Sequence, residues 1–492
     1  MKYNIVEKTD KKFKISRHIH SVFFEYFGTV IYDGIWVGKD SPIKNVDGIR
    51  KDVIDGLKEI GVGAMRWPGG CCADHYHFKN GIGKERFNRI HPIHDKANPV
   101  WRHDFGTDEF LRFCDLVGAD PILTVNTATG TPEEFVDWFE YVNGPTNTKY
   151  GKMREENGHK EPYNVKYWGI GNTDENVWHV DYNNPLSYAQ RYMQFQTALR
   201  GYRKDLYFIG LGLSSRHALP GWVGKALDHI TRNQRDLAPN ALSIHHYLGG
   251  QKKGGNEIAG DAVEYSDEAY YGLLDLLERY EHDINLHRTI IREHTPKDSN
   301  TKICFDEWGA WHPEATFDNN QNQRQTMRDG IFAALTFHIF YKNSDIVEFA
   351  METQVCNLIQ SLFETDGEKI FKTPTFYVMK MFKEHSEQYL IPTLANDVDE
   401  RLNVLSSISE DGNNITVSII NQDLYTEKHV DLDFKNYEWQ VEKADVLNSE
   451  NVRNYNTFDE PYKINLKPFK VNNLNDIIAP PHSVIRICLK KN

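Results

Sequence analysis

Eight short apolar segments, each followed by a polar loop and then by an amphipathic segment, most constrain what this 492-residue chain can fold into. Apolar runs of four to seven residues are typical of buried strands, and apolar residues three or four apart indicate helices. The predicted strands are 21–27, 64–67, 121–125, 165–170, 207–211, 242–247, 302–308 and 346–352. The predicted helices are 47–60, 108–117, 132–142, 185–202, 267–294, 322–341 and 373–387. This alternation favours an α/β fold with a (β/α)8 barrel.

A doubly wound sheet is the alternative fold, but no Gly-rich phosphate-binding turn follows the first predicted strand. After residue 387 the pattern changes to short alternating runs, including two strands on either side of Gly412-Asn413-Asn414, which is typical of a hairpin. We therefore expect a barrel over residues 18–387 and a C-terminal β-sandwich, jelly-roll-like, over 388–492. Residues 1–17 read as a small hairpin that joins the sandwich.

The formal net charge of -13 argues against nucleic acid or an anionic membrane surface as a partner. The first residues have no apolar core of a signal peptide, and no apolar run reaches the length of a membrane span. The six cysteines lack metal-ligand spacing, and most lie in apolar runs, so buried free thiols are expected. These features predict a cytoplasmic protein.

Polar side chains recur where the predicted strands end, which is where a barrel carries its catalytic groups. Each of them alone has a structural explanation, such as a buried ion pair between Glu25 and Arg66, but together they favour a polar pocket. The set comprises Glu25, Arg66, Asn126, Asn172, Thr173, His245, His246, Tyr247, Asp306, Glu307, Trp308, Glu352 and Gln354.

Glu307 stands out in this set because it is a carboxylate at the tip of the apolar run 302–308. Its burial there is costly unless hydrogen bonds or a cation compensate. A carboxylate in such a place can attack the anomeric carbon of a sugar. A helix N-cap is the structural alternative, but Gly309 and Pro313 do not begin a good helix.

Several motifs along nearly the whole chain match one enzyme family. They are Glu25 with Phe27-Gly28, GIWVG at 34–38, MRWPGGC at 65–71, HYHFKNGIG at 75–83, GTPEE at 130–134, WGIGN at 168–172, DEWG at 306–309, TMRD at 326–329 and TDGEK at 365–369. The chain resembles glycoside hydrolase family 51, the α-L-arabinofuranosidases. The resemblance implies a retaining double displacement, no metal or other cofactor, and an intracellular homo-oligomer, often a hexamer.

The resemblance also implies roles for individual residues. Glu307 falls on the nucleophile, and Arg66 on a position that supports it. Positions that hold the arabinofuranosyl ring correspond to Glu25, Asn172, Tyr247 and Gln354, and we add His245 to the substrate-binding set. Cys71 stands in a slot that is often Asn or Cys.

Thr173 is the departure from the family pattern, because the family has its glutamate acid/base at this position. A threonine hydroxyl is too weak an acid near neutral pH to protonate a leaving group. Three accounts remain open: an engineered change, a natural departure that gives a weak enzyme or a sugar-binding relic, or a displaced acid at Glu175, with Asp174 behind it. Because side chains alternate along an extended chain, Glu175 would point to the same side as Thr173, but it lies roughly 6–7 Å further along the chain than Thr173.

The resulting hypothesis is an exo-acting α-L-arabinofuranosidase that releases terminal arabinofuranosyl groups from arabinan or arabinoxylan oligosaccharides and is impaired by Thr173. The rivals are a catalytically silent arabinoside-binding protein and a related glycosidase acting on xylosides or β-glucans. The long loop 248–266, rich in Gly and Lys, is expected to carry outer substrate contacts.

Overall fold

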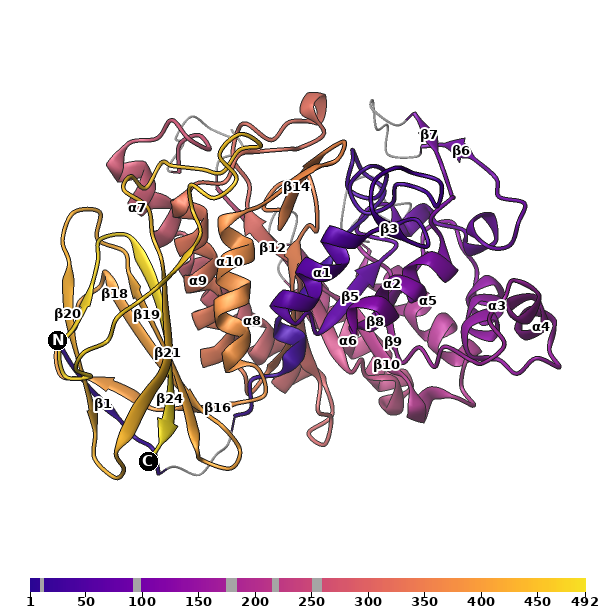
Figure 1. Cartoon of the computed structure of the whole chain (residues 1–492). Helices are drawn as coiled ribbons and strands as arrows, with labels where there is room; N and C mark the ends of the chain where they lie inside the picture. Colours follow the sequence, from indigo (N-terminus) through magenta and orange to yellow (C-terminus); the bar gives the residue numbers. More distant parts are fainter. Residues whose placement is uncertain (9–12, 92–98, 174–183, 215–220, 250–258) are drawn as a thin grey trace.

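A closed barrel of eight parallel strands forms the larger part of the protein (Figure 1). The computed structural model describes residues 1–8, 13–91, 99–173, 184–214, 221–249 and 259–492. In their order around the barrel, the strands are β2 (Ser21–Phe23), β5 (Ala64–Trp67), β8 (Asp120–Val125), β9 (Tyr167–Ile170), β10 (Tyr207–Ser214), β11 (Ala241–Leu248), β12 (Lys302–Ala310) and β13 (Val347–Thr353). All eight predicted strands are present, which confirms the predicted (β/α)8 barrel.

Helices cover the outside of the barrel. They are α1 (Lys51–Ile60), α2 (Thr107–Val117), α3 (Pro132–Asn143), α4 (Lys149–Glu156), α5 (Pro185–Ala198), α6 (Trp222–Asn233), α7 (Asp267–Asp275), α8 (Glu278–His294), α9 (Met327–Lys342) and α10 (Pro374–Phe382). The sequence analysis missed α4 and α6, although α6 buries Val223, Leu227 and Ile230 at helical spacing. No helix of the described ranges is long and apolar enough to cross a membrane.

Several predicted bounds were wrong for local reasons. Helix α9 begins at Met327 rather than at 322, because Thr326 and Asp329 form a capping box in which the Thr326 amide donates to Asp329 at 2.7 Å. The segment predicted as one helix over 267–294 is two helices, with tighter bonds between residues three apart at the junction, such as Leu277 N to Leu274 O. Strand β2 ends at Phe23, because the chain turns out of the sheet at Glu25.

The C-terminal part consists of two antiparallel-rich sheets. One has the order β16 (Tyr389–Ile391), β18 (Leu402–Ile408), β19 (Asn414–Asn421), β24 (Ser483–Lys491), β21 (Trp439–Leu447) and β22 (Leu466–Pro468). The other has the order β17 (Thr393–Ala395), β1 (Lys2–Ile5), β20 (Lys428–Phe434) and β23 (Ile477–Ala479). The predicted hairpin is confirmed as β18 and β19, in which Ile408 pairs with Ile415.

The N-terminal strand β1 pairs with both β17 and β20, so the start of the chain lies in the second sheet. Its Ile5 packs in one apolar cluster with Val417, Ile485 and Leu432, which come from both sheets and form the sandwich core. The predicted turn at residues 10–12 lies outside the described residues. Helix α9 lies between barrel and sandwich (Figure 1), where its His338 contacts Ser418 Oγ at 2.7 Å.

Two ends of the barrel interior differ in character. The amino end is filled by an apolar plug, a cluster of eight buried side chains: Phe23, Ala64, Ile122, Ile209, Ala241, Cys304, Phe349 and Met351. The carboxyl ends of the same strands carry the polar residues described next. Two further strands, β14 (Phe363–Asp366) and β15 (Lys369–Lys372), form a hairpin in the loop that follows β13.

Candidate active site

Arg66, at the end of β5, ties together three strand ends of the barrel. Its Nη1 donates to Glu307 Oε1 at 3.2 Å, and its Nε lies 3.3 Å from Asp306 Oδ2. Its Nη2 donates to the side-chain oxygen of Asn172. Because the guanidinium is a planar fork of fixed donors and is only 2% exposed, it sets the relative positions of these three side chains.

Glu307 is a buried carboxylate with several compensating partners. Besides the contact with Arg66, the Tyr247 hydroxyl donates to Glu307 Oε2 at 2.9 Å, and His245 Nδ1 lies 3.6 Å from Oε1. Burial, followed by the nearby Glu307 charge, raises the pKa of Tyr247 well above its usual value, so the hydroxyl stays protonated and donates. Glu307 is therefore a buried carboxylate held in one orientation by a cation and a hydroxyl.

A bulge in β12 allows the consecutive residues Asp306 and Glu307 to face the same site. Ser243 of β11 pairs with Cys304 of β12. Two residues further along β11, His245 pairs with Glu307, which is three residues further along β12. In a regular strand, neighbouring side chains point to opposite faces. The extra residue breaks that alternation, so both carboxylates reach Arg66.

Asp306 and His245 form a second polar pair beneath Glu307. His245 Nε2 lies 3.3 Å from Asp306 Oδ1, which also accepts a hydrogen bond of 2.6 Å from the Ser243 hydroxyl. Burial favours the neutral acid, but Arg66 and then His245 outweigh it and hold the pKa of Asp306 below its usual value. For His245, burial lowers the pKa, but the charges of Glu307 and Asp306 outweigh burial and raise it.

Glu25 and Gln354 form a reciprocal pair on the neighbouring strand ends of β2 and β13. The Glu25 amide donates to Gln354 Oε1 at 3.0 Å, and Gln354 Nε2 donates to Glu25 Oε1 at 3.2 Å. The amides of Gly70 and Cys72 donate to Glu25 Oε2 at 3.2 and 3.4 Å. Burial, and then repulsion from Glu307, raise the pKa of Glu25 to about 7.

The loop after β5 runs directly against both carboxyls. A Cβ atom added at Gly70 would lie 2.8 Å from Glu307 Oε1 and 3.5 Å from Glu25 Oε2, so only glycine leaves both groups in place. The next residue, Cys71, is partly exposed, and its pKa is raised well above the usual value by burial and then by Glu25 and Glu307. Its thiol is therefore neutral.

Thr173 is buried beside Asn172, directly after β9. Asn172 accepts from Arg66 through its Oδ1, and its Nδ2 donates to Thr173 Oγ1 at 3.3 Å. The Thr173 side chain is thus a hydroxyl adjoining the network that holds Glu307. Glu175 and Asp174 lie outside the described residues, as do residues 250–258 of the loop 248–266.

Four strand-end residues that the sequence assigned to the polar pocket lie elsewhere, and that expectation was wrong for them. His246 contacts Asp283 of α8 at 2.5 Å, and Trp308 packs against Phe337 of α9. Glu352 is buried between Met351 of the apolar plug and Thr353, so strand alternation turns it toward the helix layer. Asn126 bonds its own loop, accepting from the amide of Thr129.

Three residues that support the site received no individual role from the sequence, although Asp306 was expected in the polar pocket. They are Asp306, which shares Arg66 with Glu307, Ser243, which bonds Asp306, and Thr353, whose Oγ1 lies 3.3 Å from the Tyr247 hydroxyl. Ser243 precedes His245 by two residues, and strand parity alone could have placed both on one face. The bulge that brings in Asp306 has no such signal.

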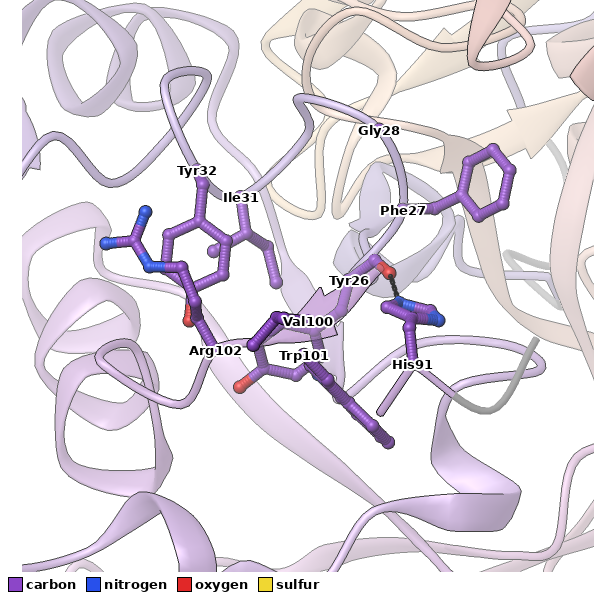
Figure 2. Close-up of a pocket in the computed structure, with 9 residues that line it drawn as sticks. All are labelled: Tyr26, Phe27, Gly28, Ile31, Tyr32, His91, Val100, Trp101 and Arg102. Carbon is purple, nitrogen blue, oxygen red and sulfur yellow. Dashed lines mark hydrogen bonds between the residues drawn. The ribbon is translucent and has the colours of Figure 1, made fainter. Parts of the chain in front are cut away.

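Aromatic side chains line a small hollow beside the residues that follow Glu25 in the chain (Figure 2). The Tyr26 ring packs with the rings of Tyr32 and Trp101. The dashed line in the figure marks His91 Nε2 donating to the Tyr26 carbonyl at 2.7 Å. The hollow between these rings has a volume of about 10 Å³. One water needs roughly 10–15 Å³, so this hollow does not hold a sugar ring.

The arrangement has one carboxylate fixed for attack and a set of hydrogen-bonding groups around it. Glu25, Gln354, Asn172 and Tyr247 present oxygen and nitrogen atoms that suit sugar hydroxyls. Among the described residues, no three His, Cys, Asp or Glu side chains are arranged to hold a metal ion. The chemistry that these groups allow is nucleophilic attack by a carboxylate at a sugar carbon.

Comparison with known proteins identifies relatives of the whole chain. The family description Alpha-L-arabinofuranosidase 1 domain matches residues 56–251, and Alpha-L-arabinofuranosidase C-terminal domain matches 306–483. An intracellular exo-α-L-arabinofuranosidase of Bacteroides ovatus is 29% identical over 97% of this chain and 93% of its own. The α-L-arabinofuranosidase C of Emericella nidulans is 31% identical over 77% of this chain and 73% of its own.

Among solved structures, the family 51 arabinofuranosidase of Xanthomonas axonopodis pv. citri superimposes with a TM-score of 0.87 at 26% identity, covering 99% of this chain and 100% of that one. The closed barrel and these relatives together identify the chain as a glycoside hydrolase. The chain belongs to the α-L-arabinofuranosidases of glycoside hydrolase family 51.

Proposed function

We propose that the protein is a retaining, exo-acting α-L-arabinofuranosidase in which Glu307 is the nucleophile and the acid/base carboxylate is missing at Thr173. The observation that carries this proposal is the fixation of Glu307 by Arg66 and Tyr247 at the strand end. The substrates are arabinan or arabinoxylan oligosaccharides with terminal arabinofuranosyl groups. Glu25, Asn172, Tyr247 and Gln354 hold that group, with His245 and Cys71 at its edge.

In the first step, Glu307 attacks the anomeric carbon, and the bond to the leaving oxygen breaks. Arg66 and Tyr247 each donate a hydrogen bond to Glu307, at 3.2 and 2.9 Å, and so orient it for attack. The departing oxygen must leave as an anion unless a proton donor is present, and Thr173 does not supply that proton at neutral pH. Positioned acid/base catalysis contributes about 10²–10⁴-fold, so hydrolysis of ordinary glycosides is slowed by a factor of this order.

An aryl α-L-arabinofuranoside with a dinitrophenolate leaving group tests the proposal, with and without azide. The leaving group departs without protonation, and azide attacks the glycosyl-enzyme without needing a base. We expect slow turnover that azide accelerates, with α-L-arabinofuranosyl azide as the product. Full activity on unactivated arabinan oligosaccharides would show that another acid replaces Thr173, and the Glu175→Gln variant would then identify it.

Two rival functions give different outcomes in the same assay. No turnover of the aryl substrate, together with measurable arabinose binding, identifies a silent arabinoside-binding protein that keeps the pocket. Turnover of aryl xylosides or β-glucans in place of the arabinofuranoside identifies a related glycosidase.

Location and assembly are part of the proposal. We infer a cytoplasmic homo-oligomer, a hexamer as in family members, that acts on imported oligosaccharides. The name of the Bacteroides ovatus relative, an intracellular enzyme, supports the location. Measurement of the mass in solution by light scattering tests the assembly.

A further inference from the structure

A second and larger cavity lies between two barrel loops and the C-terminal part. Its walls come from the loop between β12 and α9 at residues 322–325, the β14–β15 hairpin, and the segment 455–458 between β21 and β22. Both loops follow barrel strands, so the cavity lies toward the carboxyl end of the barrel, the end that carries Glu307. Figure 1 shows the segment between β21 and β22 crossing beside the β14 hairpin. We refer to this cavity as the Glu364 cavity.

The size of the Glu364 cavity distinguishes it from the hollow beside Glu25. Its volume is about 230 Å³, against about 10 Å³ for the hollow drawn in Figure 2. One water needs roughly 10–15 Å³ by this measure, so the larger cavity has room for a ligand of many atoms. It is of the right order for one sugar ring rather than for a folded partner.

One wall of the cavity is aromatic. Phe371 of β15 and Phe458 of the 455–458 segment meet edge to face, with ring centroids 4.9 Å apart and an interplanar angle of 70°. Tyr455 adds a third ring, with the Arg324 guanidinium carbon 5.4 Å from its centroid. Partly exposed rings of this kind offer flat apolar faces that suit the C–H face of a sugar.

The polar side of the cavity is a carboxyl group with two fixed neighbours. Glu364 Oε1 accepts from the Ser361 hydroxyl at 2.6 Å, and Oε2 accepts from Asn322 Nδ2 at 2.8 Å. Burial raises the pKa of Glu364 to about 7. Near neutral pH the carboxyl is therefore present in both protonation states, and it can accept from or donate to a hydroxyl group.

The walls are joined by hydrogen bonds, so the cavity is formed without a ligand. Asn456 Nδ2 donates to the carbonyls of Lys372 and Ile464, each at 2.8 Å, which ties the 455–458 segment to β15. Thr326 and Tyr455 form an isolated β-bridge. Arg324 is held by Glu314, with 2.7 Å between Nε and Oε1. Because its charge has this partner, Arg324 does not make the cavity specific for an anion.

We propose that the Glu364 cavity is a second carbohydrate-binding site, separate from the Glu307 site, which binds one neutral pentose ring of an oligosaccharide between Phe458 and Glu364. The aromatic wall takes the apolar face of the ring, and Glu364 and Asn322 take its hydroxyls. The choice of arabinan or xylan as the bound chain rests on the proposed function. The existence of the cavity and its chemistry do not.

The test is calorimetric titration of the full-length protein with two probes, a linear arabino-oligosaccharide and a linear xylo-oligosaccharide without arabinose. We expect Phe458→Ala to weaken binding of one of the two probes about tenfold or more, because it removes a stacking ring. Glu364→Gln is expected to weaken it about threefold, because the amide keeps the shape but loses one protonation state. The matched control is Tyr462→Ala. It removes a 70% exposed ring from the same connection between β21 and β22, at a residue that does not line the cavity.

Turnover of the small dinitrophenyl arabinofuranoside, in the presence of azide, is the second measurement. That substrate fills only the Glu307 site, so all three variants should match the wild type. Phe371→Leu replaces Phe458→Ala if circular dichroism shows that the latter is misfolded. If the proposed function fails, the aryl substrate is not turned over, but oligosaccharide binding and its loss on Phe458→Ala still stand.

Three results would overturn the proposal. The first is that neither probe binds. The second is that a probe binds equally well to the wild type and to Phe458→Ala. The third is that no probe binds and Phe458→Ala alters the mass in solution. The last result would identify the cavity as a contact between copies of the chain.

Discussion

The two ends of the barrel interior use the same eight strands for opposite purposes. At the amino end, Phe349 and Met351 lie in a plug of apolar side chains with almost no exposed area. At the carboxyl end, Arg66, Asp306 and Glu307 bring three charges into a space that is also nearly closed to water. Burying apolar area stabilises the fold directly, whereas buried charges stabilise it little and are costly to unpair. The first end therefore maintains the barrel, and the second holds the carboxylate that we propose as the nucleophile.

Glu307→Gln should have the largest effect at the polar end. The amide keeps the hydrogen bonds of Arg66 and Tyr247 in part but is not a nucleophile, so turnover of the aryl arabinofuranoside should fall by about 10³-fold or more. Because Asp306 still pairs with Arg66, the free energy of unfolding should fall by less than the roughly 3–5 kcal/mol expected when a buried charge is left unpaired. The aryl substrate assay and calorimetry measure the two quantities. If Glu307→Gln retains activity, another residue is the nucleophile. The difference in purpose between the two ends of the barrel would then no longer hold.

Thr173→Glu tests whether the polar end lacks only one carboxylate. We expect the rate on unactivated arabino-oligosaccharides to rise about 10²–10⁴-fold, because a general acid and base is restored. Azide acceleration should disappear in the same variant. Thr173→Gln is the matched control, since it has a similar size but no acidic proton. An equal rise in both variants would indicate a steric rather than an acid/base effect.

Phe349→Ala tests the amino end. Removal of a fully buried ring from the plug should lower the free energy of unfolding by about 3–5 kcal/mol. Turnover per folded molecule should stay within about twofold, because the ring of Phe349 packs against His18, Tyr167 and Tyr207 rather than against Glu307 or Arg66. Leu394→Ala, at a side chain that is 55% exposed on β17, is the control and should change stability by less than about 0.5 kcal/mol. Denaturant titration and the azide-assisted assay measure the two effects.

Glu25→Gln gives the smallest effect and concerns pH. The folded protein holds the pKa of Glu25 at about 7, above the usual value of 4.5, so it binds more protons than the unfolded chain between these pH values. The Glu25 contribution to the free energy of unfolding therefore falls as pH rises from about 4.5 to 7. The quantity to compare is the free energy of unfolding of Glu25→Gln minus that of the wild type. This difference should be about 1–3 kcal/mol larger at pH 8 than at pH 5.

Urea titrations at the two pH values measure this difference. Glu368→Gln, at the exposed turn of the β14–β15 hairpin, is the control variant and should leave the difference unchanged. An identical pH dependence in wild type and Glu25→Gln contradicts the prediction. It would mean that Glu25 is ionised at neutral pH, as a freely hydrated carboxylate is.

Local patterns were sufficient to predict the barrel. Each strand is a short apolar run between turns, so strand number and order follow from spacing along the chain. Outer helices such as α1 have one apolar face, whereas α9, between barrel and sandwich, is buried on all sides. Helix ends were less predictable where a cap decided them. Helix α1 ends at Ile60, as predicted, and Gly61 follows it in the left-handed conformation. The start of α9 instead depends on the capping box of Thr326 and Asp329, which lies inside the predicted segment.

The sequence alone determined the fold class, the approximate place of each strand and a set of polar residues near the strand ends, because these depend on periodicity and on position along each strand. Only the tertiary structure decided which of those residues share a site. Strand alternation turned His246, Trp308 and Glu352 toward the helices. The bulge in β12, set by the register with β11 and β13, brought Asp306 to Arg66 beside Glu307. Register is a property of paired strands and is not written in either strand by itself.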